Sequence, residues 1–164
     1  MAQTPQIILI DGPAGAGKTT LALKLQTERS CQVVHLDSVY NGWEDALTET
    51  LTQNLLSLIN AFKAGLTYEL PIYNWEQRKF VETRTIRPDN CLIIEGVGSG
   101  QSAIRDHASS LYWVEVDEEI GLARVLARDG DAIAEEMRVW KVREAEHFKK
   151  ERTREFADFI ITTT

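Results

Sequence analysis

Short apolar runs recur along the chain, and most of them end at an acidic residue. Runs without polar alternation are typical of strands that are buried on both faces of a parallel sheet. On this basis we expect strands at residues 7–10, 32–36, 91–94, 111–116 and 159–161.

The segments between these runs have helical patterns. Residues 20–25 predict a first helix, and residues 43–63 predict a second, with apolar side chains three or four positions apart on one face. Residues 118–128 and the highly charged segment 132–151 predict two more, and in the last of these Trp140 is expected to be a core residue. Because strands and helices alternate, we expect an α/β fold in three layers, with about five parallel strands and helices on both faces.

Composition limits the kind of protein. A chain of 164 residues fits one domain, here taken as residues 1–164, and 43% apolar with 26% charged residues is typical of a soluble globular protein. The net charge of −7 and the absence of a basic block argue against nucleic acid and anionic membranes as partners. Composition does not indicate what the protein acts on, and the expectation of a small-molecule acceptor comes from the motifs. No pattern indicates an oligomeric state.

Two features suggest a cytoplasmic location. Cys31 and Cys91 each begin an apolar run and have no CxxC or metal-ligand spacing, so we expect both to be reduced core residues. The start of the chain, residues 1–6, has no basic segment, and the apolar run at 7–10 is too short for a secretion signal.

A glycine-rich motif gives the first chemical information. Residues 12–19, Gly-Pro-Ala-Gly-Ala-Gly-Lys-Thr, match G-x-x-x-x-G-K-[ST] between a predicted strand and a predicted helix, which is the context of a phosphate-binding P-loop. We expect the nucleotide to be bound by Gly12, Pro13, Ala14, Gly15, Ala16, Gly17, Lys18, Thr19 and Thr20. Lys18 is expected to contact the β- and γ-phosphates, and the Thr19 hydroxyl to ligate Mg²⁺. The cofactors predicted are thus ATP and Mg²⁺.

Acidic residues end three of the predicted strands. Asp11, Asp37 and Glu95 fall where the carboxyl ends of parallel strands meet, which is where ligands bind in such sheets. We expect Glu95 to be a second Mg²⁺ ligand, since hard oxygen donors suit that ion. Asp37 is either a catalytic group or a helix N-cap.

Four further motifs occur in the same order as in a known group of enzymes. They are Asp37-Ser38-Val39-Tyr40, Pro71-Ile72-Tyr73-Asn74-Trp75 followed by Arg78-Lys79, Glu95-Gly96, and Arg124 with Arg128-Asp129. With these motifs the chain resembles the uridine–cytidine kinases and the wider group of P-loop kinases that contains phosphoribulokinase and pantothenate kinase. No guanine-specific signature or transporter ATPase signature is present.

The resemblance implies roles for individual residues. It implies that Asp37 is the base for the acceptor hydroxyl and that Arg124 and Arg128 are catalytic residues of a short lid at about 124–134. It also places an acceptor-binding segment at about 40–90, with Asp37, Tyr40, Trp43, Tyr73, Trp75 and Arg78 as substrate-binding residues. The residues themselves leave other interpretations open, because aromatic side chains are often core and spaced arginines are often a solvated helix face.

The sequence also departs from the uridine–cytidine kinases. Glu76-Gln77 stands where those enzymes have a histidine that contacts the pyrimidine, and Asn74 replaces an aspartate. We therefore expect an ATP- and Mg²⁺-dependent kinase for a hydroxyl of a nucleoside- or sugar-like metabolite. One alternative is a nucleoside monophosphate kinase, if the basic residues Arg78, Lys79, Arg84 and Arg87 bind an acceptor phosphate. The other is an ATP-binding regulatory protein with slow ATPase activity.

Overall fold

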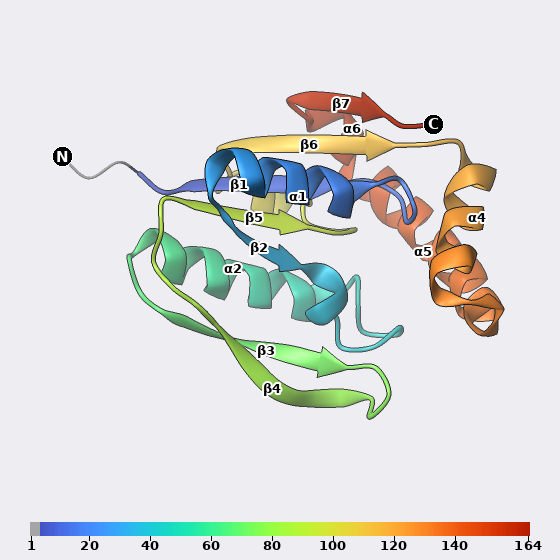
Figure 1. Ribbon diagram of the computed structural model, residues 1–164, viewed down its shortest axis with the longest axis horizontal. Helices are drawn as coiled ribbons and strands as arrows, with labels where there is room; N and C mark the ends of the chain where they lie inside the picture. Colours follow the sequence, from blue (N-terminus) through green and yellow to red (C-terminus); the bar gives the residue numbers. More distant parts are fainter. Residues whose placement is uncertain (1–3) are drawn as a thin grey trace.

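A five-stranded parallel sheet forms the centre of the molecule. In the computed structural model, which describes residues 4–164, its strands lie in the order β2-β5-β1-β6-β7. Their bounds are β1 (Gln6–Asp11), β2 (Gln32–His35), β5 (Cys91–Glu95), β6 (Ser110–Glu115) and β7 (Phe159–Thr162). All five point the same way, so their carboxyl ends share one edge (Figure 1). The predicted α/β fold is confirmed; the prediction about the start of the chain lies partly in residues 1–3, outside the described residues.

Helices cover both faces of the sheet, as the unbroken apolar runs indicate. In β1, Ile8 and Ile10 pack toward α1 (Lys18–Arg29), whereas Ile7 and Leu9 belong to the cluster with α2 (Glu49–Lys63). That second cluster also contains side chains of α3 (Ser102–Arg105), α4 (Glu118–Asp129) and α5 (Ala134–Glu151). Two short 3₁₀ helices, η1 (Leu36–Ser38) and η2 (Asp131–Ile133), and the short helix α6 (Thr153–Phe156) complete the described helices. Within residues 4–164, no helix is long and apolar enough to cross a membrane.

The second long helix begins later than the sequence predicts. It starts at Glu49 and not at Trp43, because residues 41–48 form a turn. Asn41 and Asp45 make a β-bridge, and the hydroxyl of Thr48 donates a hydrogen bond to Asp45. Trp43 therefore lies on a loop and is not part of the helix.

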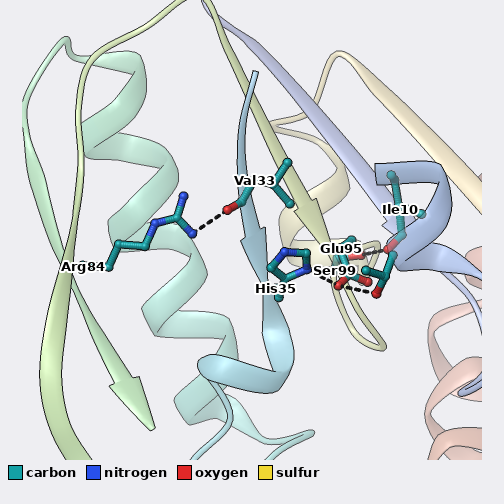
Figure 2. Close-up of polar contacts among 7 residues, drawn as sticks. Ile10, Val33, His35, Arg84, Glu95 and Ser99 are labelled. Carbon is teal, nitrogen blue, oxygen red and sulfur yellow. Dashed lines mark hydrogen bonds and ion pairs between the residues drawn. The ribbon is translucent and has the colours of Figure 1, made fainter. Parts of the chain in front are cut away.

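An antiparallel hairpin occupies a region to which the sequence analysis assigned no element. It consists of β3 (Tyr68–Asn74) and β4 (Lys79–Ile86), and it lies beyond the β2 edge of the sheet (Figure 1). Arg84 of β4 reaches the edge strand, where its guanidinium donates to the carbonyl of Val33 at 2.6 Å (Figure 2). The hairpin thus covers a strand edge whose backbone acceptors otherwise have no strand partner.

The prediction that both cysteines are reduced is wrong. Cys31 and Cys91 form a disulfide, with their Cα atoms 4.7 Å apart. The reason is strand register, because Gln32 of β2 lies opposite Leu92 of β5, which places the two preceding cysteines side by side. The disulfide lies at the amino ends of these strands, away from the edge where the acidic residues gather.

We expect reduction of this disulfide to destabilise the fold. The bond closes a loop with a sequence separation of 60 residues, and cross-links of this kind contribute about 2–4 kcal/mol, mainly by restricting the unfolded chain. Urea unfolding of the oxidised protein should therefore show a higher midpoint than unfolding in reductant. The Cys31→Ser, Cys91→Ser double variant should match the reduced protein, and equal midpoints in all three samples would contradict the prediction.

Candidate active site

The loop between β1 and α1 is shaped by glycines that no other residue can replace. A Cβ atom at Gly12, where φ is 144°, would lie 2.0 Å from the carbonyl oxygen of Val114. At Gly15, where φ is 81°, it would lie 2.1 Å from the carbonyl oxygen of Gly121. The loop therefore packs tightly between β6 and the first turn of α4, in the conformation that the motif at residues 12–19 predicts.

Within the loop, the carbonyl of Pro13 accepts two hydrogen bonds. One comes from the amide of Ala16 at 3.2 Å and the other from the ammonium group of Lys18 at 2.8 Å. Lys18 is 9% exposed, and its burial lowers the pKa of the ammonium group, against the opposing charges of Glu95 and Asp11. Its ammonium group is thus held over the loop, ready for an anionic ligand.

Asp11 fixes the start of the loop through hydrogen bonds between its carboxylate and backbone amides. Its fully buried carboxylate accepts hydrogen bonds from the backbone amides of Gly12 at 2.7 Å, Gly98 at 3.2 Å and Gly100 at 2.9 Å. Burial raises the pKa of Asp11 to about 6, although these amides and Lys18 favour the charged form. The sequence analysis placed Asp11 at this edge but assigned it no role, because its partners come from a loop far along the chain.

Thr19, Glu95 and His35 make a line of hydrogen bonds across the strand ends. The Thr19 hydroxyl donates to Glu95 at 3.1 Å. Nδ1 of His35 lies 2.6 Å from the same carboxylate oxygen (Figure 2). This hydrogen bond raises the pKa of His35, although its partial burial works in the opposite direction. Glu95 is 5% exposed, so these hydrogen bonds lie in a nearly dry environment. His35 is a site residue that the sequence analysis missed.

The hydroxyl of Thr19 and the carboxylate of Glu95 fit a magnesium ion. Both are hard oxygen donors, and they already lie within hydrogen-bond distance of one another. Among residues 4–164, no three His, Cys, Asp or Glu side chains are grouped as a metal cage. A small donor set of this kind suits Mg²⁺, which usually keeps several of its waters.

Asp37 lies in η1, directly after β2, with an exposed side chain. The surrounding strand ends desolvate its carboxyl group, and this desolvation raises the pKa of that group. The nearby charge of Glu95 raises it further, while Lys18 and Arg128 oppose the shift. The indole of Trp75 donates to the backbone carbonyl of Asp37 at 2.8 Å. Asp37 therefore lies between the phosphate loop and the hairpin.

The predicted acceptor aromatics come together in one cluster. Trp43 lies 5.4 Å from Trp75 between ring centroids, and Tyr73 lies 4.9 Å from Trp75. Two rings that the sequence analysis did not include join the cluster: Phe80, 5.2 Å from Tyr73, and Trp140, which contacts Tyr40 at 5.4 Å and Trp43 at 6.0 Å. Tyr40, Tyr73 and Trp140 are buried, as core residues would be, whereas Trp75 is 39% exposed.

A cavity lies between the edge strand β2 and the hairpin, and no ring of the aromatic cluster lines it. Its volume is about 330 Å³. Its lining residues are Val34, His35, Ser38, Leu70, Ile72, Glu82, Thr83 and Arg84. The cavity thus borders the turn that carries Asp37 and the histidine that contacts Glu95.

The three arginines predicted to bind ligand have different positions. Arg128 is exposed and paired with Asp129, and it is near enough to Asp37 for its charge to act on that carboxyl group. Arg124 instead donates to the carbonyl of Gly15 at 3.2 Å and to the hydroxyl of Thr163 at 3.1 Å, so it braces the loop from outside. Arg78 is exposed in the hairpin turn.

A loop of this sequence, with its lysine bonded to the Pro13 carbonyl and a Thr–Glu pair beside it, has the features of a phosphate-binding P-loop. The family model described as phosphoribulokinase / uridine kinase matches residues 48–160, more than half of the chain. The chain belongs to this family, and it is an ATP-dependent phosphotransferase that acts on a small molecule. No match was found among the curated proteins compared with it.

Solved structures share the fold. A protein described as a possible uridine kinase from Bacillus stearothermophilus is 23% identical, with a TM-score of 0.68 over 98% of this chain and 90% of that one. A protein described as a fructose transport system kinase from a Silicibacter species is 19% identical, with a TM-score of 0.77 over 97% and 90%. Shikimate kinase from Bacteroides thetaiotaomicron is 15% identical, with a TM-score of 0.54 over 96% and 86%. At these identities the similarity concerns the fold alone.

We expect Asp11→Asn to destabilise the protein by about 1–2 kcal/mol, because the backbone amides left without an acceptor cost more than removal of a buried charge gains. The amide group would point one of its own donors at a backbone N–H, leaving both without an acceptor. Chemical unfolding measures the change. The matched control is Asp117→Asn, at the exposed N-cap of α4, where asparagine caps as well as aspartate and the cost should be within about 0.5 kcal/mol. Equal losses for both variants would refute the anchoring role of Asp11.

Proposed function

We propose that the protein transfers the γ-phosphoryl group of MgATP to a hydroxyl group of a small, nucleoside- or sugar-like metabolite. The observation that supports this most directly is the position of Asp37. Its accessible carboxyl group is near enough to Lys18 for the ammonium charge to act on it, and its backbone carbonyl accepts a hydrogen bond from Trp75 of the aromatic cluster. A base in that position lies between a phosphate donor and a planar acceptor.

On the donor side, the chain supplies positive charge at short range. The backbone amides of the loop, the first turn of α1 and the ammonium of Lys18 bind the phosphates, with Gly12, Pro13, Ala14, Gly15, Ala16, Gly17 and Thr20 as the remaining loop contacts. Arg128, on the proposed lid at about 124–134, adds a cation on the side of Asp37. Arg124 acts indirectly in this proposal, by holding the loop through the Gly15 carbonyl.

Thr19 and Glu95 are the proposed ligands of Mg²⁺. The ion, when bound, supplies charge neutralisation between the phosphate oxygens. His35 holds the Glu95 carboxylate in place through its ring nitrogen, which leaves the second carboxylate oxygen of Glu95 available. The roles of these residues are therefore to orient oxygen donors and to balance charge.

The proton transfer belongs to Asp37. Its carboxylate accepts the proton of the acceptor hydroxyl as the hydroxyl oxygen forms a bond to the γ-phosphorus. The bond between that phosphorus and the oxygen bridging to the β-phosphate breaks, and ADP leaves with the electron pair. A pKa raised by desolvation and by Glu95 makes Asp37 a stronger base than an ordinary aspartate.

The acceptor is proposed to bind in the segment 40–90, against Tyr40, Trp43, Tyr73 and Trp75. Aromatic rings in edge-to-face contact, with interplanar angles of 60° and 75°, form walls that suit a flat base or the apolar face of a sugar. The basic residues of the hairpin do not support an acceptor phosphate. Arg84 is turned toward the Val33 carbonyl, and Arg78 lies at the turn.

The direct test is ADP release in the presence of MgATP and a panel of nucleosides, sugars, vitamin precursors and nucleoside monophosphates. We expect stimulation by a nucleoside or a sugar. The Asp37→Asn variant should lose at least about a hundredfold in turnover while binding MgATP within about threefold of wild type, because its side chain takes the proton without contacting the loop. Asp106→Asn, an exposed change after α3, is the matched control. Stimulation by monophosphates alone, or by no compound, would overturn the proposal.

We also expect a shifted pH profile. Because Asp37 must be deprotonated to act, kcat/KM should fall on the acid side as pH drops through its pKa, and the raised pKa places this limb above the usual value for aspartate of about 4. Rates measured from about pH 4 to 9 show the limb. His35→Asn should keep it, since that histidine is not the base. An acid limb near pH 4 would contradict the raised pKa of Asp37, and a limb that disappears with His35 would assign the proton to another group.

A further inference from the structure

Glu144 is a buried carboxylate on the highly charged helix α5, beside the buried side chains of Met137 and Trp140. Only 2% of the residue is accessible to solvent. Its Oε2 atom accepts a hydrogen bond from the backbone amide of Ala14 at 3.1 Å and another from the indole of Trp140 at 3.0 Å, and its Oε1 atom accepts one from Lys141 at 2.6 Å. Removing a charge from water is costly unless it is paired, and here three donors satisfy it.

The contact with Ala14 acts on one particular peptide group. The N–H of Ala14 and the C=O of Pro13 belong to the same planar unit, and they point in opposite directions. Glu144 binds the N–H, while the C=O accepts from the ammonium of Lys18 at 2.8 Å. Rotation of this peptide would break both contacts, so the position of Glu144 determines where the Lys18 ammonium is held.

Trp140 in turn fixes the carboxylate of Glu144. The two residues are one helical turn apart on α5, and the indole N–H lies against the same oxygen that binds Ala14. The ring of Trp140 is itself held by Tyr40 and Trp43. Two layers of side chains thus support one peptide group of the phosphate loop.

We propose that Glu144 is a positioning residue for nucleotide binding, which orients the Pro13–Ala14 peptide and through it Lys18, and that Trp140 holds Glu144 in place. The proposal rests on the proposed function in one respect, that the loop binds MgATP. Neither side chain touches the nucleotide in this scheme. Their effect is to keep the loop and its lysine in one arrangement before the ligand arrives, so that less order has to be created on binding.

Four variants separate positioning from general packing. Glu144→Gln keeps an oxygen acceptor for the Ala14 amide, whereas Glu144→Ala removes it. Trp140→Phe keeps an aromatic ring but deletes the N–H that holds Glu144. Trp113→Phe is the matched control, because its indole also donates to a carboxylate, that of Glu115 at 2.8 Å, without contacting the phosphate loop. MgATP binding is measured by calorimetry without any acceptor, together with the amide proton shift of Ala14 by NMR in the nucleotide-free protein.

We expect Glu144→Ala to weaken MgATP binding about tenfold, as the loss of a hydrogen bond to a charged group implies, and Glu144→Gln to stay within about threefold. Trp140→Phe should weaken binding about threefold to tenfold, while Trp113→Phe has no effect beyond about twofold. The Ala14 amide proton should lie downfield in the wild type and move upfield in Glu144→Ala and Trp140→Phe only.

Equal effects of the two tryptophan variants on MgATP affinity, or an Ala14 amide shift that none of the substitutions changes, would overturn the proposal. If Glu144→Ala does not fold, Glu144→Gln and Trp140→Phe carry the same test. Failure of the proposed function would look different. Wild-type protein would then bind no MgATP, while the Ala14 amide shift would still respond to Glu144 and Trp140 and support the positioning of the loop.

Discussion

A single buried carboxylate connects the two loops from which the active site is made. Asp11 ends the central strand β1, and its oxygens bind amides at the start of the phosphate loop and amides in the segment after β5. These segments are far apart in sequence. The Asp11 carboxylate has no access to water, so it needs hydrogen-bond donors from both of them. Because the loop after β5 is fixed in this way, Glu95 at the end of that strand lies opposite Thr19.

Those parts of the fold that depend on local pattern could be predicted from the sequence. The five parallel strands are continuous apolar runs, and the loop at residues 12–19 has its glycines where the backbone meets Val114 and Gly121. The hairpin was missed because most of β4 is exposed and shows no apolar alternation. The disulfide was missed because it depends on which strands are neighbours, and β2 pairs with β5 although the two cysteines are 60 positions apart in the sequence.

The same distinction applies to the site. Asp37, Glu95 and the loop residues were predicted because the ends of parallel strands must share an edge. His35, Asp11 and Glu144 were not predicted to have roles, since each depends on a partner that only the tertiary fold brings near. Arg124 and Arg128 illustrate the limit. Their spacing predicts a shared helix face, but not that one braces the loop while the other is exposed beside Asp37.

The contacts that hold the phosphate loop come from residues that are synthesised long after the loop itself. Its residues leave the ribosome long before the groups that hold it, which are Glu144, 130 positions later, and Thr163, whose hydroxyl donates to the carbonyl of Ala16 from 147 positions away. Contacts of such long range form late, after most of the chain is available. A nascent chain therefore carries the whole nucleotide motif long before it has a finished nucleotide site, and premature termination yields a protein with the motif but without its braces.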